Sequence, residues 1–154
     1  MSFRIRGLDP APFQSLFQAD AETLRGARME RVRVEEKPGA PCRITLADAE
    51  VGEEVLLLSY THQPAPTPYA QQGPIFVRAA IEAFDAVDVV PPAFLPRMMS
   101  LRAFDALDMM LDADLVQGAD SPALIARLFA NPDVAYIHAH YARRGCFAAR
   151  IDRA

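Results

Sequence analysis

Three histidines are the side chains of this sequence best suited to acid–base or metal chemistry. His138 and His140 are two residues apart, and His62 ends another apolar segment. On a strand, that spacing places His138 and His140 on one face, with Cα atoms about 7 Å apart. Because an imidazole with its ordinary pKa can transfer a proton near neutral pH, His62, His138 and His140 are the candidate catalytic residues.

The same three histidines could instead bind a metal ion, since three imidazoles with an open position form a known type of zinc site. The competing interpretation is structural, because strand histidines often bond to neighbouring polar groups. One pair at chelating spacing is a weak signal, which favours the structural interpretation over the metal site. The sequence identifies no cofactor, since glycine-rich phosphate loops and paired-cysteine zinc spacings are missing.

Two arginines lie in apolar segments and are candidate ligand-binding residues. Arg43 follows Pro41-Cys42, and Arg78 ends the segment that begins at Gly73. A buried guanidinium needs a partner, because leaving it unpaired is very costly. The partner is either an internal carboxylate, such as Asp48, Glu53 or Glu54, or the anionic group of a ligand. Both interpretations stay open.

The elements that would position these side chains are mostly strands. Period-2 alternation and apolar runs predict an edge strand at 3–6, a central strand at 53–62, and further strands at 29–34, 42–46 and 75–78. Two hairpins follow, at 98–104 with 109–116 and at 134–141 with 146–151. Short helices are expected at 10–17, 20–26, 79–84 and 121–129. The fold class is therefore α+β, a mostly antiparallel sheet with a few short helices packed on one side.

The last hairpin decides which way Cys146 points. If its turn is the four residues 142–145, His140 pairs with Phe147, and Cys146 faces away from His138 and His140. A bulge at Gly145 would reverse this orientation. Because small buried thiols commonly fill cores, a packing role is favoured for both cysteines over a nucleophilic role for Cys146.

A proline-studded connection, from Pro64 to Pro74, separates two of the expected strands. Long irregular loops in compact domains are often functional. The leading hypothesis is a site for a small anionic ligand at the rim of the sheet under this loop. Its lining would comprise His62, Tyr69, Arg78, His138 and His140, with Arg43 approaching. Whether such a site is catalytic is left open.

The alternative hypothesis is a non-catalytic homodimeric interaction module. Its apolar contact surface would comprise Tyr69, Phe76, Met98 and Met99, and the histidines would be structural.

Composition limits the other classes. At 154 residues with 51% apolar and 23% charged residues, the chain is expected to be one globular domain, residues 1–154. The net charge of −4, with arginines interleaved among acids, argues against a nucleic-acid partner. Its longest aliphatic run, residues 55–58, is too short to span a membrane.

The amino-terminal residues lack a secretory signal, and the chain has two cysteines, which predicts a cytoplasmic protein with free thiols. Pairing of Cys42 with Cys146 stays open. The many alanines and arginines indicate a GC-rich bacterial genome.

Several segments together resemble a known bacterial family. They are Cys42-Arg43-Ile44-Thr45-Leu46, Tyr60-Thr61-His62-Gln63-Pro64, Gly73-Pro74-Ile75-Phe76-Val77-Arg78, Tyr136-Ile137-His138-Ala139-His140 and Gly145-Cys146-Phe147-Ala148-Ala149-Arg150. With them the chain resembles, over its whole length, the family filed as "domain of unknown function 1203". The resemblance implies an uncharacterised protein and carries over no reaction, cofactor or catalytic residue.

Overall fold

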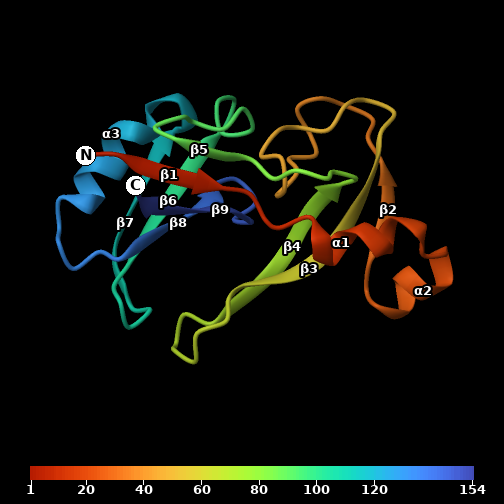
Figure 1. The fold of residues 1–154 in the computed structure, drawn as a ribbon, viewed down its shortest axis with the longest axis horizontal. Helices are drawn as coiled ribbons and strands as arrows, with labels where there is room; N and C mark the ends of the chain where they lie inside the picture. Colours follow the sequence, from red (N-terminus) through yellow and green to blue (C-terminus); the bar gives the residue numbers. More distant parts are fainter.

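A computed structural model describes residues 1–154, and its strands form two antiparallel sheets (Figure 1). The larger sheet has six strands in the order β5-β1-β9-β8-β6-β7. In chain order these are β1 (Phe3–Arg6), β5 (Asp85–Val87), β6 (Met98–Phe104), β7 (Met110–Gln117), β8 (Tyr136–Tyr141) and β9 (Phe147–Arg153). The smaller sheet has the order β2-β3-β4, formed by β2 (Glu30–Arg33), β3 (Glu54–Gln63) and β4 (Gln71–Arg78).

The helices are short and divide between the two sheets. Helix α3 (Ser121–Phe129) packs on the large sheet, whereas α1 (Ala11–Gln14), the 3₁₀ helix η1 (Ser15–Gln18) and α2 (Ala21–Gly26) accompany the small one (Figure 1). A second 3₁₀ helix, η2 (Gly118–Asp120), leads into α3. None of these helices has the length and apolar character needed to cross a membrane.

The two faces of the large sheet differ in character, because alternate residues point to opposite sides. One face contributes Ile5, Leu101, Ile137 and Ile151 to a buried core with Ile125 of α3. The opposite face carries Arg102 beside His138, and Ser100 beside His140, in the strand register. A polar row therefore crosses a sheet whose other side packs on the apolar core.

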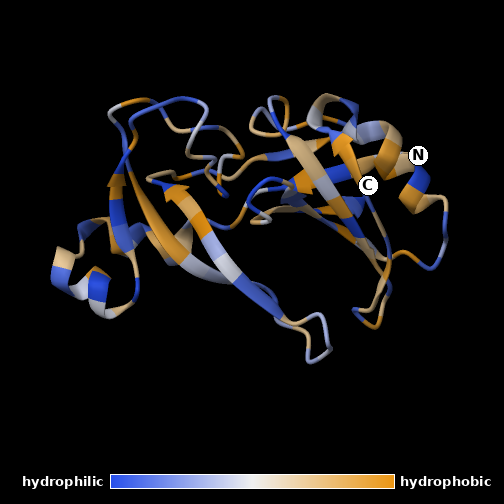
Figure 2. Cartoon of the chain, turned by 180° about the vertical axis from the view of Figure 1, so that it is seen from behind, coloured by the Kyte–Doolittle hydropathy of each residue, from blue (hydrophilic) through white to orange (hydrophobic).

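The β3–β4 hairpin changes character along its length. At its base Leu56, Leu58 and Ile75 join Phe13 and Leu24 in a second buried core. Toward its tip the residues become polar, as the change from orange to blue in Figure 2 shows. The hairpin thus has an apolar anchor and a polar end, which crosses to the large sheet.

The α+β class is confirmed, as are the long central strand β3, both C-terminal hairpins and helix α3. Residues 3–6 were expected at an edge, but β1 lies between β5 and β9. Residues 42–46 form no strand: only isolated bridges at Pro41 and Cys42 occur, and the chain turns at Leu46, whose φ is 50°.

Two other expected elements also differ. No helix forms at 79–84. The connection after β3 is shorter than expected, since β4 begins at Gln71 and Pro74 pairs with Ser59 inside the ladder. Pro74 is tolerated because β4 is an edge strand of the small sheet.

At Gly7 the backbone passes very close to the backbone of Ile44, and a substitution there tests this packing. A Cβ added there would lie 1.9 Å from the carbonyl oxygen of Ile44, whereas one added at Gly26 would meet nothing within 4 Å. We expect Gly7→Ala to lower the free energy of unfolding by about 2 kcal/mol or more, because backbone must shift. Gly26→Ala, in a helix, should change it by no more than about 1 kcal/mol. Equal urea midpoints for the two variants would contradict this packing.

Candidate functional site

The three histidines come from two sheets and meet at the polar face of the large one. His62 of β3 lies with its ring centroid 5.1 Å from that of His140 and 6.2 Å from that of His138. Both contacts are edge-on, at 80° and 70°. The three histidines that the sequence analysis grouped therefore lie in one cluster, although they are up to 78 residues apart in the chain.

Phe147 of β9 holds this cluster together. Its ring is stacked on that of His62, with centroids 5.0 Å apart and planes 5° apart. The same ring meets the edges of His138 and His140 at 5.2 and 5.8 Å. The register opposes His140 with Phe147, which confirms the pairing expected from a four-residue turn.

Hydrogen bonds fix two of the three imidazoles. Nδ1 of His140 lies 2.9 Å from the carbonyl oxygen of Gly145, so it carries the proton and Nε2 is left as an acceptor. Nε2 of His62 lies 3.1 Å from Oε1 of Gln71. Nδ1 of His62 and Nδ1 of His138 are buried and have no partner in the protein. Unsatisfied buried nitrogens are uncommon, and these two lack a polar partner within the protein.

Burial keeps the histidines neutral. It lowers the pKa of His138 to about 3, with further lowering by His140 and His62 and by Arg150 and Arg102. Burial lowers the pKa of His140 to about 4, and burial also lowers the pKa of His62. The expectation of a histidine titrating near its ordinary pKa is therefore wrong for the free protein, since few of these imidazoles carry a proton near pH 7.

Arg102 of β6 is the site residue that sequence reasoning missed. It lies opposite His138 in the register, and its positive charge lowers the pKa of all three histidines. It forms no ion pair, and its one hydrogen bond is a long one, 3.4 Å from Nε to Oγ of Ser100. Partial burial lowers the pKa of this guanidinium as well. The sequence did contain a signal for Arg102. Polar Ser100 and Arg102 alternate with apolar Leu101 and Ala103, which indicates a strand with one polar face.

Tyr136 closes one end of the cluster through a polar network. Its hydroxyl donates to Oδ1 of Asp108 at 2.6 Å and accepts from Nε2 of Gln63 at 2.9 Å. Burial, together with Asp108, raises the pKa of Tyr136 to about 12. The guanidinium of Arg150 lies over the Tyr136 ring, 4.0 Å from its centroid, and its Nε donates to Asp152.

The hairpin tip rests against the turn between β6 and β7. Tyr69 contacts Phe104 edge-on, with ring centroids 6.0 Å apart. Thr67 Oγ1 lies 3.5 Å from the carbonyl oxygen of Asp108. Tyr69 is therefore next to the cluster without touching the histidines.

The other two candidate ligand-binding residues lie differently. Arg78 is opposite Val55, at the far end of β3 from His62, about 23 Å along the strand. Its guanidinium forms a two-pronged ion pair with Glu53, one bond of which measures 2.8 Å. The partner of Arg78 is therefore an internal carboxylate, that of Glu53. Arg78 is too far from the histidines to share a ligand with them.

Arg43 is buried directly behind the cluster. Its Nε donates to the carbonyl oxygen of Phe147 at 2.7 Å, and Nη1 donates to that of Pro41. The guanidinium also lies 4.9 Å from the ring centroid of Tyr141. Carbonyl oxygens and an aromatic face, a combination that the sequence interpretation did not include, satisfy this arginine.

The structure also bears on the metal site, the dimer surface and the two cysteines considered above. No group of three His, Cys, Asp or Glu side chains is arranged to hold a metal ion, so the structure gives the three-histidine metal site no support. Met99 lies wholly in the core, so the dimer surface that included it is wrong at that residue. Cys42 and Cys146 are both free thiols.

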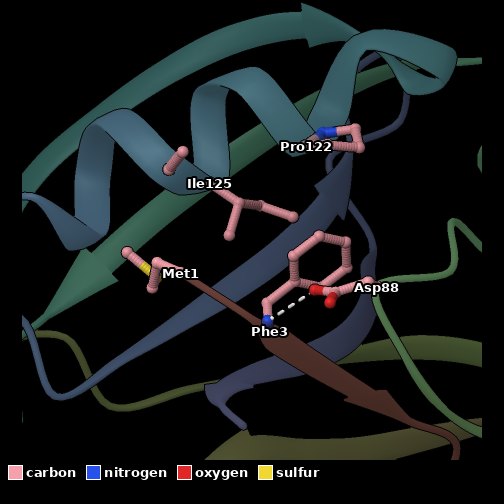
Figure 3. Close-up of a pocket in the computed structure, with 6 residues that line it drawn as sticks. Met1, Phe3, Asp88, Pro122 and Ile125 are labelled. Carbon is pink, nitrogen blue, oxygen red and sulfur yellow. Dashed lines mark hydrogen bonds between the residues drawn. The ribbon is translucent and has the colours of Figure 1, made fainter.

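Two cavities lie elsewhere in the molecule. One, of about 220 Å³, is formed where Met1 and Phe3 face Ile125 of α3, with Asp88 at its edge (Figure 3). That carboxylate already accepts from the backbone N–H of Phe3 at 2.9 Å. The other, of about 430 Å³, lies between Phe13, Phe17 and Ile81. Neither cavity includes a histidine.

An α+β protein with two antiparallel sheets and a polar cluster between them is the class that these observations define. The chain belongs to the family described as "Protein of unknown function (DUF1203)", whose family model matches residues 39–153. That range contains every histidine together with Arg102 and Phe147. No curated protein and no solved structure matches the chain.

The buried histidines give a pH dependence of stability with a definite sign. The folded-state pKa values of His138 and His140, about 3 and 4, lie below the ordinary value of 6.5. The unfolded chain therefore binds protons that the folded chain does not, and stability present above about pH 6.5 is lost as the pH falls. We expect the free energy of unfolding to fall by up to about 1.4 kcal/mol per pH unit for each histidine between about pH 6 and pH 4.5.

Urea unfolding across this range measures the slope. The variant with both His138→Gln and His140→Gln should show a shallower slope, whatever its absolute stability. A wild-type slope near zero would contradict burial of neutral imidazoles.

Proposed function

We propose that this protein binds a small oxyanion, the carboxylate or phosphate group of a small molecule, at Arg102 between the three histidines. The observation that carries the proposal is a half-buried guanidinium with no carboxylate partner. The three other partly buried arginines, Arg4, Arg78 and Arg97, each form an ion pair with a carboxylate. Arg102 stands apart from this pattern.

Charge accounts for why an anion is the expected ligand. Withdrawing a cation from water costs several kcal/mol unless an opposite charge or several hydrogen bonds compensate. Ser100 offers only one long bond, and the surrounding imidazoles are neutral. An oxyanion would match the two-pronged geometry of the guanidinium and restore the missing compensation.

The histidines would act as hydrogen-bond partners of the ligand. Nε2 of His140 is an acceptor in the neutral ring, and Nδ1 of His138 is unpartnered. Either nitrogen becomes a donor on taking up a proton, which a bound anion would favour. Binding is supported over proton-transfer catalysis, because a general acid or base works best with a pKa near the working pH.

Acetate binding tests the role of Arg102. We expect Arg102→Gln to weaken binding at least about 10-fold, because a hydrogen-bonded charge pair contributes about 1.5–3 kcal/mol. Isothermal titration calorimetry or histidine NMR shifts would measure it.

Arg127→Gln is the matched control. Arg127 pairs with Asp112 and Asp114 on the opposite face of the sheet, so its loss should leave acetate binding unchanged. Acetate binding that survives in Arg102→Gln, or is equally reduced in both variants, would refute the proposed site.

Proton uptake is a second test, with sulfate as a probe whose own charge stays constant. A bound anion raises the pKa values of His138 and His140 from about 3 and 4 by stabilising the imidazolium form. We therefore expect sulfate to bind more tightly as the pH falls from about 7 to about 5. Calorimetry in two buffers of different ionisation enthalpy would give the number of protons. Affinity independent of pH would show that no histidine faces the anion.

A bacterial origin, a cytoplasmic location and a homodimer stay predictions of the sequence. We propose them only as the setting in which the ligand would be met.

A further inference from the structure

An exposed apolar strip lies beside Arg102 on the same face of the large sheet. In the register Arg102 is opposite Ala113 of β7, and Ser100 is opposite Leu115. Directly opposed residues of antiparallel strands point to the same side. Leu111 lies two residues before Ala113, where the register shifts between Ala103 and Phe104. Leu111, Ala113 and Leu115 form what is here termed the β7 strip.

All three residues of the β7 strip are exposed. Leu115 is 60% exposed and Leu111 is 43% exposed, on the outermost strand of the sheet. Edge strands are usually protected by charged residues, so an apolar strip at this position calls for an explanation. It spans about 14 Å along the strand.

We infer that the ligand of Arg102 is a small amphipathic oxyanion, an alkyl carboxylate, whose hydrocarbon chain lies along the β7 strip. This inference rests on the oxyanion site proposed above and specifies its ligand. The uncompensated charge of Arg102 selects the head group, and the adjacent Ala113 and the two leucines select the chain. A purely polar anion would use only the first of these features.

A second copy of the chain is a poorer occupant of this strand. The backbone N–H groups of Ala113 and Leu115 donate, each at 2.8 Å, to the carboxylates of Asp112 and Asp114. Those carboxylates are in turn paired with Arg127 of α3. Donors that an added strand would need are therefore engaged, which disfavours extension of the sheet across β7.

The groove between Phe13, Phe17 and Ile81 is also a poorer seat for such a ligand. The charged residue at its rim is Arg78, and Glu53 already neutralises that guanidinium. The groove thus provides apolar surface without a free cation, and Ile81, which is 89% exposed, provides a control position there.

A chain-length series tests the inference. Acetate, butanoate, hexanoate and octanoate are titrated into the full chain, together with octylammonium as a cation of the same length. We expect the affinity to rise about 2- to 4-fold per methylene, the value for partial to full removal of a methylene from water. Octylammonium should not bind.

Variants separate the strip from the head-group site. Leu115→Ser should flatten the dependence on chain length and leave acetate affinity unchanged, while Ile81→Ser should alter neither. Arg102→Gln should weaken every member of the series together.

Three other outcomes of these titrations would each contradict a different part of the inference. Acetate binding that depends on Arg102 but shows no gain with chain length would overturn the amphipathic ligand and leave the oxyanion site intact. A chain-length gain that persists in Arg102→Gln, or that Ile81→Ser abolishes, would place the chain elsewhere and overturn the inference. Absence of binding by every carboxylate would overturn both the inference and the proposed function.

Discussion

The ring of Phe147 lies flat against His62, and through this contact the hairpin of the small sheet rests on the large one. The stack measures 5.0 Å between centroids, and the same ring touches both histidines of β8 edge-on. Behind it, Arg43 donates to the Phe147 backbone, which fixes this residue from the other side. One aromatic side chain therefore contacts every imidazole in the cluster.

Desolvation by these contacts sets the charge of the cluster. Neutral imidazoles are compatible with burial, whereas the guanidinium of Arg102 beside them cannot lose its proton at ordinary pH. The fold thus keeps one positive charge at a partly buried place without an internal partner. Everywhere else in the protein where an arginine is packed closely, acids, carbonyl oxygens or aromatic rings compensate it.

Local patterns accounted for much of the fold and for the three histidines. The spacing of His138 and His140, and the alternation along β3 that ends at His62, are properties of single strands and can be read without tertiary information. The turn of the last hairpin likewise depends on neighbouring residues, so the opposition of His140 and Phe147 was accessible.

What the sequence could not provide was pairing between distant strands. Arg102 faces His138 only because β6 lies next to β8, an arrangement that local alternation does not specify. Arg78 was expected beside the histidines for the same reason, because its distance from His62 depends on the β3–β4 register, which local patterns do not specify. Residues 42–46 have strand-like composition, yet the chain turns at Leu46, and local patterns likewise do not specify the division into two sheets.

Crystals grown with selenate would test the central claim most directly, because selenium marks the position of an oxyanion by its anomalous scattering. The account predicts an anomalous peak within hydrogen-bonding distance of the Arg102 guanidinium, beside His138 and His140. A structure in which Arg102 is ion-paired to a carboxylate of the protein, with no selenate at the histidines, would contradict it.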